Sequence, residues 1–533
     1  MKRRLVTLSL LAVFAVQIGH AQSADVQSLV NDGNAAAHRD DHAEAISDYQ
    51  KAIKLDPSVR ESLLLKLGQQ YLWSGQSAAA ADLLGEFVKK HSADCSARST
   101  YALALSWANR LKEAETMYRD IRNNCPELSL DTALGQARVL RWRERNRAAA
   151  KIYKQVEKNG TSAQQNDAKL GIALTELAQD ENRTARDTFR QLASEPKPDP
   201  SAIEGLAVSD LHLGMPEAAR HDLEIGTADN VHTPQLAALS EDIGSLTAPS
   251  ITPTFNFFRD ADGTTYYGGE LRGNYSFAPR TTSEAFVGSS DLDGAFGPIN
   301  GRWTGAAIEH RFNETFDLRT EGRFNEFSEA SFNPLTGEAD AVITPADNTR
   351  IDLAAARILI WDNQPALLHH LIGTFGSVGL DQRFTAADRL SLAVDATQWS
   401  EGNRRMRYRI TPGHTFEGVP SLTLSLPFLY QTYDRGFDFG LFSPPGYIEL
   451  APAADVSFRR AHIWTFDFYG RLGGQKETYQ PWKPLGTFRA RVARDLHGKW
   501  GMFAEFAHSS SNVASSSGFS RTSMTISLTR RID

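Results

Sequence analysis

Polar and apolar residues alternate along most of residues 251–533. Because successive side chains of a β-strand point to opposite faces, this period of two predicts strands. In the segment RRMRYRI (residues 404–410), for example, Met406, Tyr408 and Ile410 alternate with three arginines. About 15 such segments of roughly 10 residues fit into this half of the chain, which predicts an all-β domain. Further alternating apolar sets are Phe316, Leu318 and Phe324; Leu422, Leu424 and Leu426; Trp464, Phe466 and Phe468; and Phe488, Ala490 and Val492.

The two faces of these expected strands differ in kind. One face is apolar and aromatic, and the other carries fixed charges of both signs. A soluble sandwich would bury the apolar face, whereas a transmembrane barrel turns it to lipid and keeps the polar face inside. Aromatic residues near the expected strand ends, such as Trp361 and Trp399, favour the barrel, because aromatic girdles mark membrane interfaces. We predict an antiparallel β-barrel of about 16 strands, with 14 as the fallback and a soluble sandwich as the alternative. We expect Ser328–Asp347 and Phe437–Tyr447 to be long links.

The first half of the chain has a longer period, with an alanine every 33 to 36 residues and a large residue four positions later. Such pairs let two antiparallel helices approach closely where the small residue lies. The segment Gly33–Pro57 resembles the tetratricopeptide repeat, and we expect about six helix pairs stacked into a superhelix. The recurring alanines are Ala45, Ala80, Ala114, Ala149, Ala185 and Ala218, and the large residues are Tyr49, Leu84, Tyr118, Tyr153 and Phe189.

Composition separates the two halves and the start of the chain. Of the 28 phenylalanines, 25 lie after residue 250. At the start, three basic residues precede the apolar run Leu5–Ile18, and small residues follow at Gly19 and Ala21, which is typical of a cleaved secretory signal peptide. We therefore predict a signal peptide at 1–21, a tetratricopeptide repeat domain at 22–248 and an outer-membrane barrel at 249–533. This order implies the outer membrane of a Gram-negative bacterium, with the repeats in the periplasm.

Charge and motif content exclude several function classes. The 57 basic and 64 acidic residues give a net charge of -7, which does not favour a nucleic-acid binder. The turns at 260–263 and 291–294 are similar to calcium loops but lack the downstream glutamate. His369 and His370 lack a third ligand nearby, and no catalytic motif stands in a fitting context. We expect no catalytic residues, no metal and no cofactor.

Cys95 and Cys125 are the only two cysteines. Cys95 opens the first helix of the third expected repeat, and Cys125 ends its second helix. These ends are neighbours in an antiparallel pair, and the compartment outside the cytoplasm is oxidising. We predict a disulfide, with two free buried thiols as the alternative.

The overall plan resembles that of exopolysaccharide export porins, which join a periplasmic repeat superhelix to an outer-membrane barrel. Within Phe437–Leu450, the residues Phe442, Ser443, Pro444 and Tyr447 are similar to a motif in the barrel of the cellulose synthase operon protein C family. Poly-N-acetylglucosamine export porins share the architecture. The resemblance implies a polysaccharide substrate, with cellulose as one candidate, and synthase subunits in the periplasm or inner membrane as partners of the repeats.

Charged residues on the polar face are the candidates for lining a channel. Arginine suits this role because its planar group holds a hydroxyl or carboxylate while pairing across the lumen. The alternative is that these charges pair only to hydrate and stiffen the wall. The Phe437–Tyr447 link folds inward as a gate in one interpretation and is a plain surface loop in the other. The candidate residues are Asp317, Arg319, Glu321, Arg323, Arg405, Arg407, Arg409, Arg489 and Arg491.

The sequence thus predicts an outer-membrane porin that exports an exopolysaccharide. The alternative from a different class is a non-transporting scaffold or assembly protein whose repeats are anchored by a plugged barrel. An enzyme embedded in the barrel is a third interpretation, because a Ser, His and acid brought together by the fold leave no sequence motif.

Overall fold

The computed structural model describes residues 25–228, 233–246, 248–460, 463–497 and 499–532. The predicted signal peptide, residues 1–21, lies outside the described residues. The chain forms two compact units, one ending at Ile172 and the other spanning Ala173–Asp533. The second unit therefore contains the last repeat helices as well as the strands. No helix in the described part of the chain is long and apolar enough to cross a membrane.

Helices occupy the first half of the chain. Residues 25–38 are helical, and most of the helices that follow contact the next helix along the chain. Aspartates begin some of them: the Asp41 carboxylate accepts from the Glu44 N–H, and Asp94 accepts from the Ala97 N–H, which satisfies amides that have no partner within the helix. The helices are α2 (His42–Leu55), α3 (Arg60–Trp73), α4 (Ser77–Lys90), α5 (Cys95–Trp107), α6 (Leu111–Asn124), α7 (Ser129–Trp142), α8 (Asn146–Asn159), α9 (Ser162–Leu177), α10 (Asn182–Ala193), α11 (Pro200–His212), α12 (Pro216–Ala228) and α13 (Pro234–Leu246).

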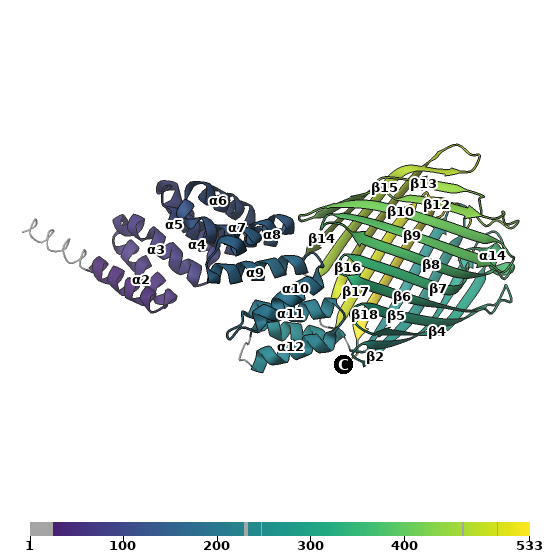
Figure 1. Ribbon diagram of the computed structural model, residues 1–533, viewed down its shortest axis with the longest axis horizontal. Coiled ribbons are helices and arrows are strands. Elements are labelled where there is room, and N and C mark those ends of the chain that lie inside the picture. The colour runs from purple at the N-terminus through teal and green to yellow at the C-terminus, as the bar shows by residue number, and fades with distance from the viewer. Residues whose placement is uncertain (1–24, 229–232, 247, 461–462, 498, 533) are drawn as a thin grey trace, which may run out of the picture. The chain divides into compact units, whose positions relative to one another are not determined.

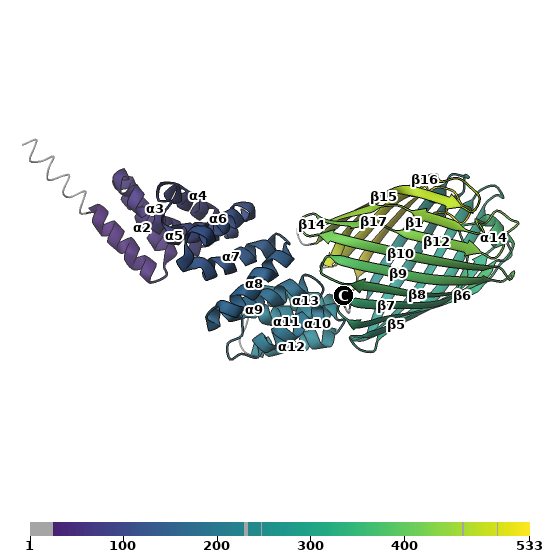
Figure 2. The same ribbon diagram turned by 45° about the horizontal axis from the view of Figure 1, so that its top comes forward.

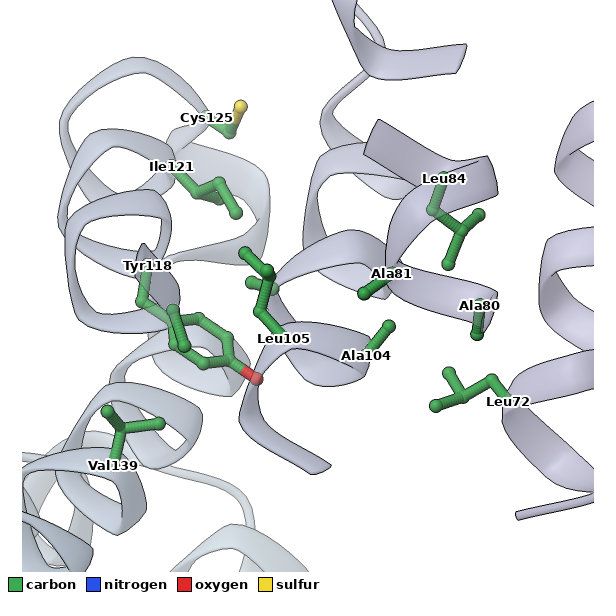
Figure 3. Close-up of a cluster of buried hydrophobic side chains, with 12 residues drawn as sticks. Leu72, Ala80, Ala81, Leu84, Ala104, Leu105, Tyr118, Ile121, Cys125 and Val139 are labelled. Atoms are coloured by element: carbon green, nitrogen blue, oxygen red, sulfur yellow. The ribbon is translucent and has the colours of Figure 1, made fainter. Parts of the chain in front are cut away.

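The recurring alanines and large residues form the helical core, as their spacing predicts, except in the last repeat, where Ala219 is buried in place of the predicted Ala218. Ala80 and Ala114 are fully buried, and Tyr118 packs in the same cluster as Leu105 and Val139 (Figure 3). Small residues are required opposite the large ones, because a Cβ at Gly171 would collide with the Tyr153 ring. Glycines face Tyr49, Leu84, Tyr118 and Phe189 in the same way, so one packing rule applies to these repeats.

A disulfide joins Cys95 at the start of α5 to Cys125 at the end of α6, with the two Cα atoms 6.0 Å apart. Cys125 is fully buried beside Ile121. The bond ties together the two helices of the third pair.

Strands occupy the second half and form a single closed sheet (Figure 1). Each strand pairs antiparallel with its neighbours, and β1 closes the barrel by pairing with both β2 and β18. The strands are β1 (Ser250–Asp260), β2 (Thr265–Ala278), β3 (Thr281–Asp293), β4 (Ile299–Arg311), β5 (Phe316–Phe327), β6 (Leu335–Ala346), β7 (Thr349–Leu359), β8 (Ile372–Arg383), β9 (Asp388–Trp399), β10 (Arg404–Phe416), β11 (Ser421–Ser425), β12 (Phe428–Tyr433), β13 (Tyr447–Leu450), β14 (Ala453–Arg460), β15 (Trp464–Glu477), β16 (Lys483–His497), β17 (Trp500–Ser509) and β18 (Arg521–Arg531).

These segments make 16 strands, the predicted number. Pro427 separates β11 from β12, and Pro452 separates β13 from β14, because proline has no N–H for the ladder. In both cases the two halves cross the wall as one strand, since β10 pairs with β11 and β12, and β15 pairs with β13 and β14. The tilt of the strands around the barrel is visible in two views (Figures 1 and 2).

The expected long link Ser328–Asp347 is wrong, because β6 occupies most of it. One face of β6 carries Gly337, Ala339 and Ala341, which are too small to stand out as an apolar stripe. Pairing with β5 and β7 nevertheless fixes the strand in the wall.

Candidate functional site

The closed wall has an apolar outer face and a charged inner face. On β10 the Tyr408 and Ile410 side chains are exposed on one face, whereas Arg407 on the other is partly buried. Ion pairs identify the inner face: Arg272 of β2 lies 3.4 Å from Glu321 of β5, although β3 and β4 lie between these strands. Side chains two or more strands apart converge only on the concave side of the wall.

The first charged network spans β2 to β6. Arg319 contacts Glu321 at 2.6 Å, Glu284 at 3.0 Å and Glu338 at 3.1 Å. Arg323 contacts Glu321 at 3.1 Å and Glu270 at 3.4 Å. Arg319, Glu321 and Arg323 lie on one face, as the alternation predicted, and both arginines contact Glu321. Their partners Glu270, Glu284 and Glu338 were not among the predicted residues.

Aromatic rings support this network. The guanidinium groups of Arg272 and Arg323 lie 4.3 and 4.8 Å from the centre of the Phe286 ring. The Trp303 indole N–H donates to Glu270 at 2.8 Å. Because carboxylates and an aromatic ring both contact these arginines, the side chains of the network are held in fixed positions.

The fourth predicted residue of β5, Asp317, lies apart from this network. Its carboxylate pairs with Arg311 of β4 at 2.5 Å, near the strand ends that the helices approach.

The second network contains a single carboxylate for three arginines. Arg405, Arg407 and Arg409 of β10 lie 3.3, 2.9 and 3.2 Å from Asp395 of β9, whose side chain is fully buried. Arg405 also donates to Thr397 at 2.9 Å. Sequence alternation predicted the arginines but missed Asp395, because only the pairing of β9 with β10 brings it beside them.

The third network lies on β14 to β17. Arg491 pairs with Glu505 at 2.8 Å, and Arg489 lies 4.0 Å from Asp455. Arg489 also lies over the Tyr469 ring at 5.1 Å. Arginines on the inner face are thus paired at three places around the wall.

At the end of the barrel away from the helices, here called the loop end (loops 360–371, 434–446 and 510–520), three loops bind one another. The Phe442 N–H donates to the Ser516 carbonyl at 2.7 Å, and Asn363 donates to the Ser517 hydroxyl at 2.8 Å. Arg521 pairs with Asp362 at 2.7 Å. These contacts link each of the three loops to another.

The motif Phe442, Ser443, Pro444 and Tyr447 lies in this assembly. The Ser443 hydroxyl accepts from the Phe437 N–H and donates to the Leu441 carbonyl, so it closes the loop on itself. The Pro444 carbonyl accepts from the Tyr433 N–H at 3.2 Å. The Tyr447 side chain is fully buried, and its hydroxyl bonds to Glu449 and Gln475, each at 2.7 Å.

The loop 360–371 packs on the inner face of the wall. It contains the short helix α14 (Gln364–Leu368), and its buried Leu367 contacts a cluster that includes Phe258, Tyr266 and Phe327. A cavity of about 880 Å³ inside the barrel is lined by inner-face residues such as Trp303 and by Trp361 of this loop, so Trp361 lies inside and not in the expected aromatic girdle.

At the opposite end, here called the helix end (turns 279–280, 312–315, 347–348 and 384–387), α10 to α12 contact the strand turns. The Arg183 guanidinium lies 3.2 Å from Asp347 and donates to the Glu314 carbonyl at 2.7 Å. Arg186 pairs with Glu314, and Arg280 pairs with Glu217. Side chains from both sides therefore join the last repeats to the barrel within the second unit.

These contacts surround a polar cavity of about 1000 Å³, lined by Asp180, Arg183 and His212 from the helices and by Arg311 and Arg350 from the strands. Nearby, burial and the neighbouring Asp222 carboxylate raise the pKa of Asp210 to about 7. Burial also lowers the pKa of His212.

Among the described residues, one group of Cys, His and carboxylate side chains has the spacing of metal ligands: Cys95, Cys125 and Glu127. Both sulfurs belong to the disulfide, so this group offers no thiolate. In the turn at 260–263, the Asp260 and Asp262 carboxylates both accept from the Thr264 N–H. The two aspartates therefore stabilise the turn, which explains their presence without a calcium ion.

Known proteins are similar to each of the two parts of the chain. The profile of the tetratricopeptide repeat matches residues 62–93, and the helical half contains such repeats. No curated protein matches the chain in sequence. Among solved structures, the chain is similar to a "bacterial polysaccharide outer membrane secretin", with 13% identity and a TM-score of 0.45 over 54% of this chain and 99% of that chain.

Two further solved structures have lower scores. A tetratricopeptide repeat protein from Parabacteroides merdae has 18% identity and a TM-score of 0.37, over 42% of this chain and 87% of that chain. OpdQ of Pseudomonas aeruginosa has 10% identity and a TM-score of 0.32, over 54% of this chain and 98% of that chain.

Proposed function

We propose that this protein is an outer-membrane porin that exports an exopolysaccharide, with its repeats in the periplasm. The observation that carries the proposal is the closed 16-strand wall with apolar side chains outside and paired charges inside. Such a wall fits lipid on one side and water on the other. The helix end is then the periplasmic entrance and the loop end is the extracellular exit.

A hydrated polysaccharide crosses without chemistry, so the inner face needs hydrogen-bonding groups and not a catalyst. Paired arginines and carboxylates offer many such groups in a fixed arrangement. We infer that the protein is not an enzyme and needs no cofactor. Cellulose is one candidate polymer, and the repeats bind subunits of its synthesis machinery.

The three loops at the loop end serve as the gate of this channel. The loops are bound to one another and to the wall through a small set of contacts, such as Arg521 with Asp362, and breaking these contacts would let the loops separate. Arg521 of β18 is central, because it contacts Asp362 at 2.7 Å and lies 3.9 Å from the Phe258 ring centre.

The same loops favour a second candidate function. If they never leave the lumen, the barrel is a plugged anchor, and the protein is a scaffold that holds the repeats beneath the outer membrane. The buried Leu367 and Leu371 side chains of the loop 360–371 support this alternative.

Single-channel recording of the full chain in planar bilayers separates the two candidates. We compare the wild type with Arg521→Ala, which releases the loop 360–371, and with Arg530→Ala on the same strand, which lies over the Trp500 ring on the outer face. An export channel gives rare openings in the wild type and in Arg530→Ala, and openings at least several-fold more frequent in Arg521→Ala. If Arg521→Ala and a variant lacking residues 362–369 both stay closed, the barrel is an anchor and the export proposal is wrong.

A further inference from the structure

The helical half contains three tryptophans, and all three occupy the same position of the repeat. Trp73, Trp107 and Trp142 are the last residues of α3, α5 and α7, at intervals of 34 and 35 residues. Their exposed fractions are 52%, 46% and 41%. Large apolar side chains at such exposure, repeated in register, form a strip on the surface of the first unit, here called the tryptophan ladder.

The fold does not require these indoles. Leu72, which precedes Trp73, is fully buried and supplies the core contact of that helix end. In the next two repeats the position of the ladder holds Leu177 and His212, and the helices α9 and α11 end there in the same way. Since leucine and histidine satisfy the same structural position, the tryptophans serve a purpose other than packing.

The ladder offers ring faces together with polar groups. Trp73 and Trp107 meet edge to face, with their centres 5.7 Å apart, so the two indoles present surfaces in different directions. Polar residues follow the first two tryptophans at the start of the next helix: Gln76 after Trp73, and Arg110 after Trp107, whose guanidinium pairs with Glu113 at 2.7 Å and Asp82 at 3.1 Å. An indole bordered by polar groups is the combination that suits a sugar, whose pyranose ring has apolar C–H faces and a polar edge.

The register of the repeats connects the ladder position with the barrel entrance. Leu177 and His212, its equivalents in the last two repeats, both line the cavity at the helix end. In the second unit, this edge of the repeats therefore faces the space before the channel. The repeat position that holds tryptophan in the first unit thus holds Leu177 and His212 in the second unit.

We propose that the tryptophan ladder is a binding strip for the glycan chain, on which successive sugar rings of a β-linked polysaccharide stack before the chain enters the barrel. This rests on the proposed export function and adds a substrate site outside the barrel. A polymer with a repeating unit matches tryptophans that recur at one position of a repeating fold.

Isothermal titration of the full chain in detergent with cellohexaose and with N-acetylchitohexaose tests the ladder. The test variant is Trp73→Leu, Trp107→Leu and Trp142→Leu together, because the fold already accepts leucine at residue 177. The control is Trp500→Leu on the barrel, and circular dichroism at 222 nm verifies the helices of both variants.

We expect the wild type and Trp500→Leu to bind at least one of the two hexasaccharides, and the triple variant to bind it at least tenfold more weakly. Equal binding by the triple variant, or no binding of either sugar by the wild type, overturns the proposal. If the triple variant keeps sugar binding but loses a co-purifying synthase subunit, the ladder is a protein interface and the proposal is wrong. Channel recordings on the same preparations separate this result from the export function: openings without sugar binding reject only the ladder, and sugar binding without openings rejects only export.

Discussion

The two halves of this protein place aromatic residues differently: the repeats bury them, and the barrel exposes them on its outer face. In the repeats, Tyr153 has 1% of its surface exposed, and it packs against Ala149 and Val156. In the barrel, Phe277 of β2 is 56% exposed on the outer face, while Arg319 and Glu321 of β5 are paired on the inner face. The hydrophobic effect acts in both halves, but the repeats remove apolar surface from water by burying it, and the barrel does so by facing lipid.

Truncating an aromatic residue should therefore cost much more stability in the repeats than in the barrel, and this is the largest effect that we expect. Tyr153→Ala leaves a cavity in the repeat core and should lower the free energy of unfolding of the repeats by about 3–5 kcal/mol. Phe277→Ala loses the transfer of the ring from water to lipid but leaves no cavity, because lipid fills the space, so barrel stability should fall less, by no more than about 2 kcal/mol. Urea unfolding followed at 222 nm measures the first, and heat-dependent migration on gels measures the second. Equal losses in both halves would contradict the comparison.

The disulfide supports only the half that folds in water. Replacing both Cys95 and Cys125 by serine opens a loop with a sequence separation of 30 residues. We expect the free energy of unfolding of the repeats to fall by about 2–4 kcal/mol, because the unfolded chain gains conformational freedom. Urea unfolding of the oxidised, reduced and double-serine proteins measures this change. The migration of the folded barrel on gels should stay the same in all three, and a shift there would show that the two halves depend on each other.

Changing one inner-face carboxylate should alter ion selectivity and leave the repeats unaffected. Asp395→Asn leaves Arg405, Arg407 and Arg409 without their shared carboxylate. We expect the ratio of chloride to potassium permeability to rise about twofold, because net positive charge draws anions into the lumen. Reversal potentials in a KCl gradient, recorded in the open Arg521→Ala background, measure the ratio. Glu326→Gln near the loop end of β5, whose side chain is on the outer face, is the control and should leave the ratio unchanged.

The smallest effect concerns pH, at the last repeat. Burial and Asp222 raise the pKa of Asp210 to about 7 in the folded protein, from an ordinary value of 3.8. The stability that Asp210 contributes is then fully present below about pH 4 and is lost as the pH rises through about 7. We expect α11 and α12 to lose about 1 kcal/mol of protection between pH 5.5 and 8, and Asp222→Asn to reduce this loss. Hydrogen exchange, corrected for the intrinsic rate at each pH, measures it, and a gain in protection with rising pH would contradict the assignment.

Sequence patterns predicted features that depend on neighbours along the chain and missed those that depend on pairing. The alanine spacing predicted the helix pairs, because close packing needs a small residue at a fixed place in each repeat. Alternation predicted the inner-face positions of Arg405 and Arg491, but their partners Asp395 and Glu505 lie on the adjacent strands. Strand β6 was missed because Gly337 and Ala339 gave its outer face no apolar signal. The tryptophan spacing was visible in the sequence, whereas its exposure depends on how the helix ends pack.

The central claim is that the barrel wall has lipid outside and water inside, and spin labels along β7 test it most directly. The native cysteines are joined to each other, so single cysteines introduced at residues 353 to 356 in the full chain can be labelled selectively. In lipid vesicles, we predict that labels at Leu353 and Ala355 are accessible to oxygen, and that labels at Ala354 and Ala356 are accessible to a water-soluble nickel complex. If all four labels show the same accessibility, or if the protein stays monodisperse in water without detergent, the wall is not a membrane barrel.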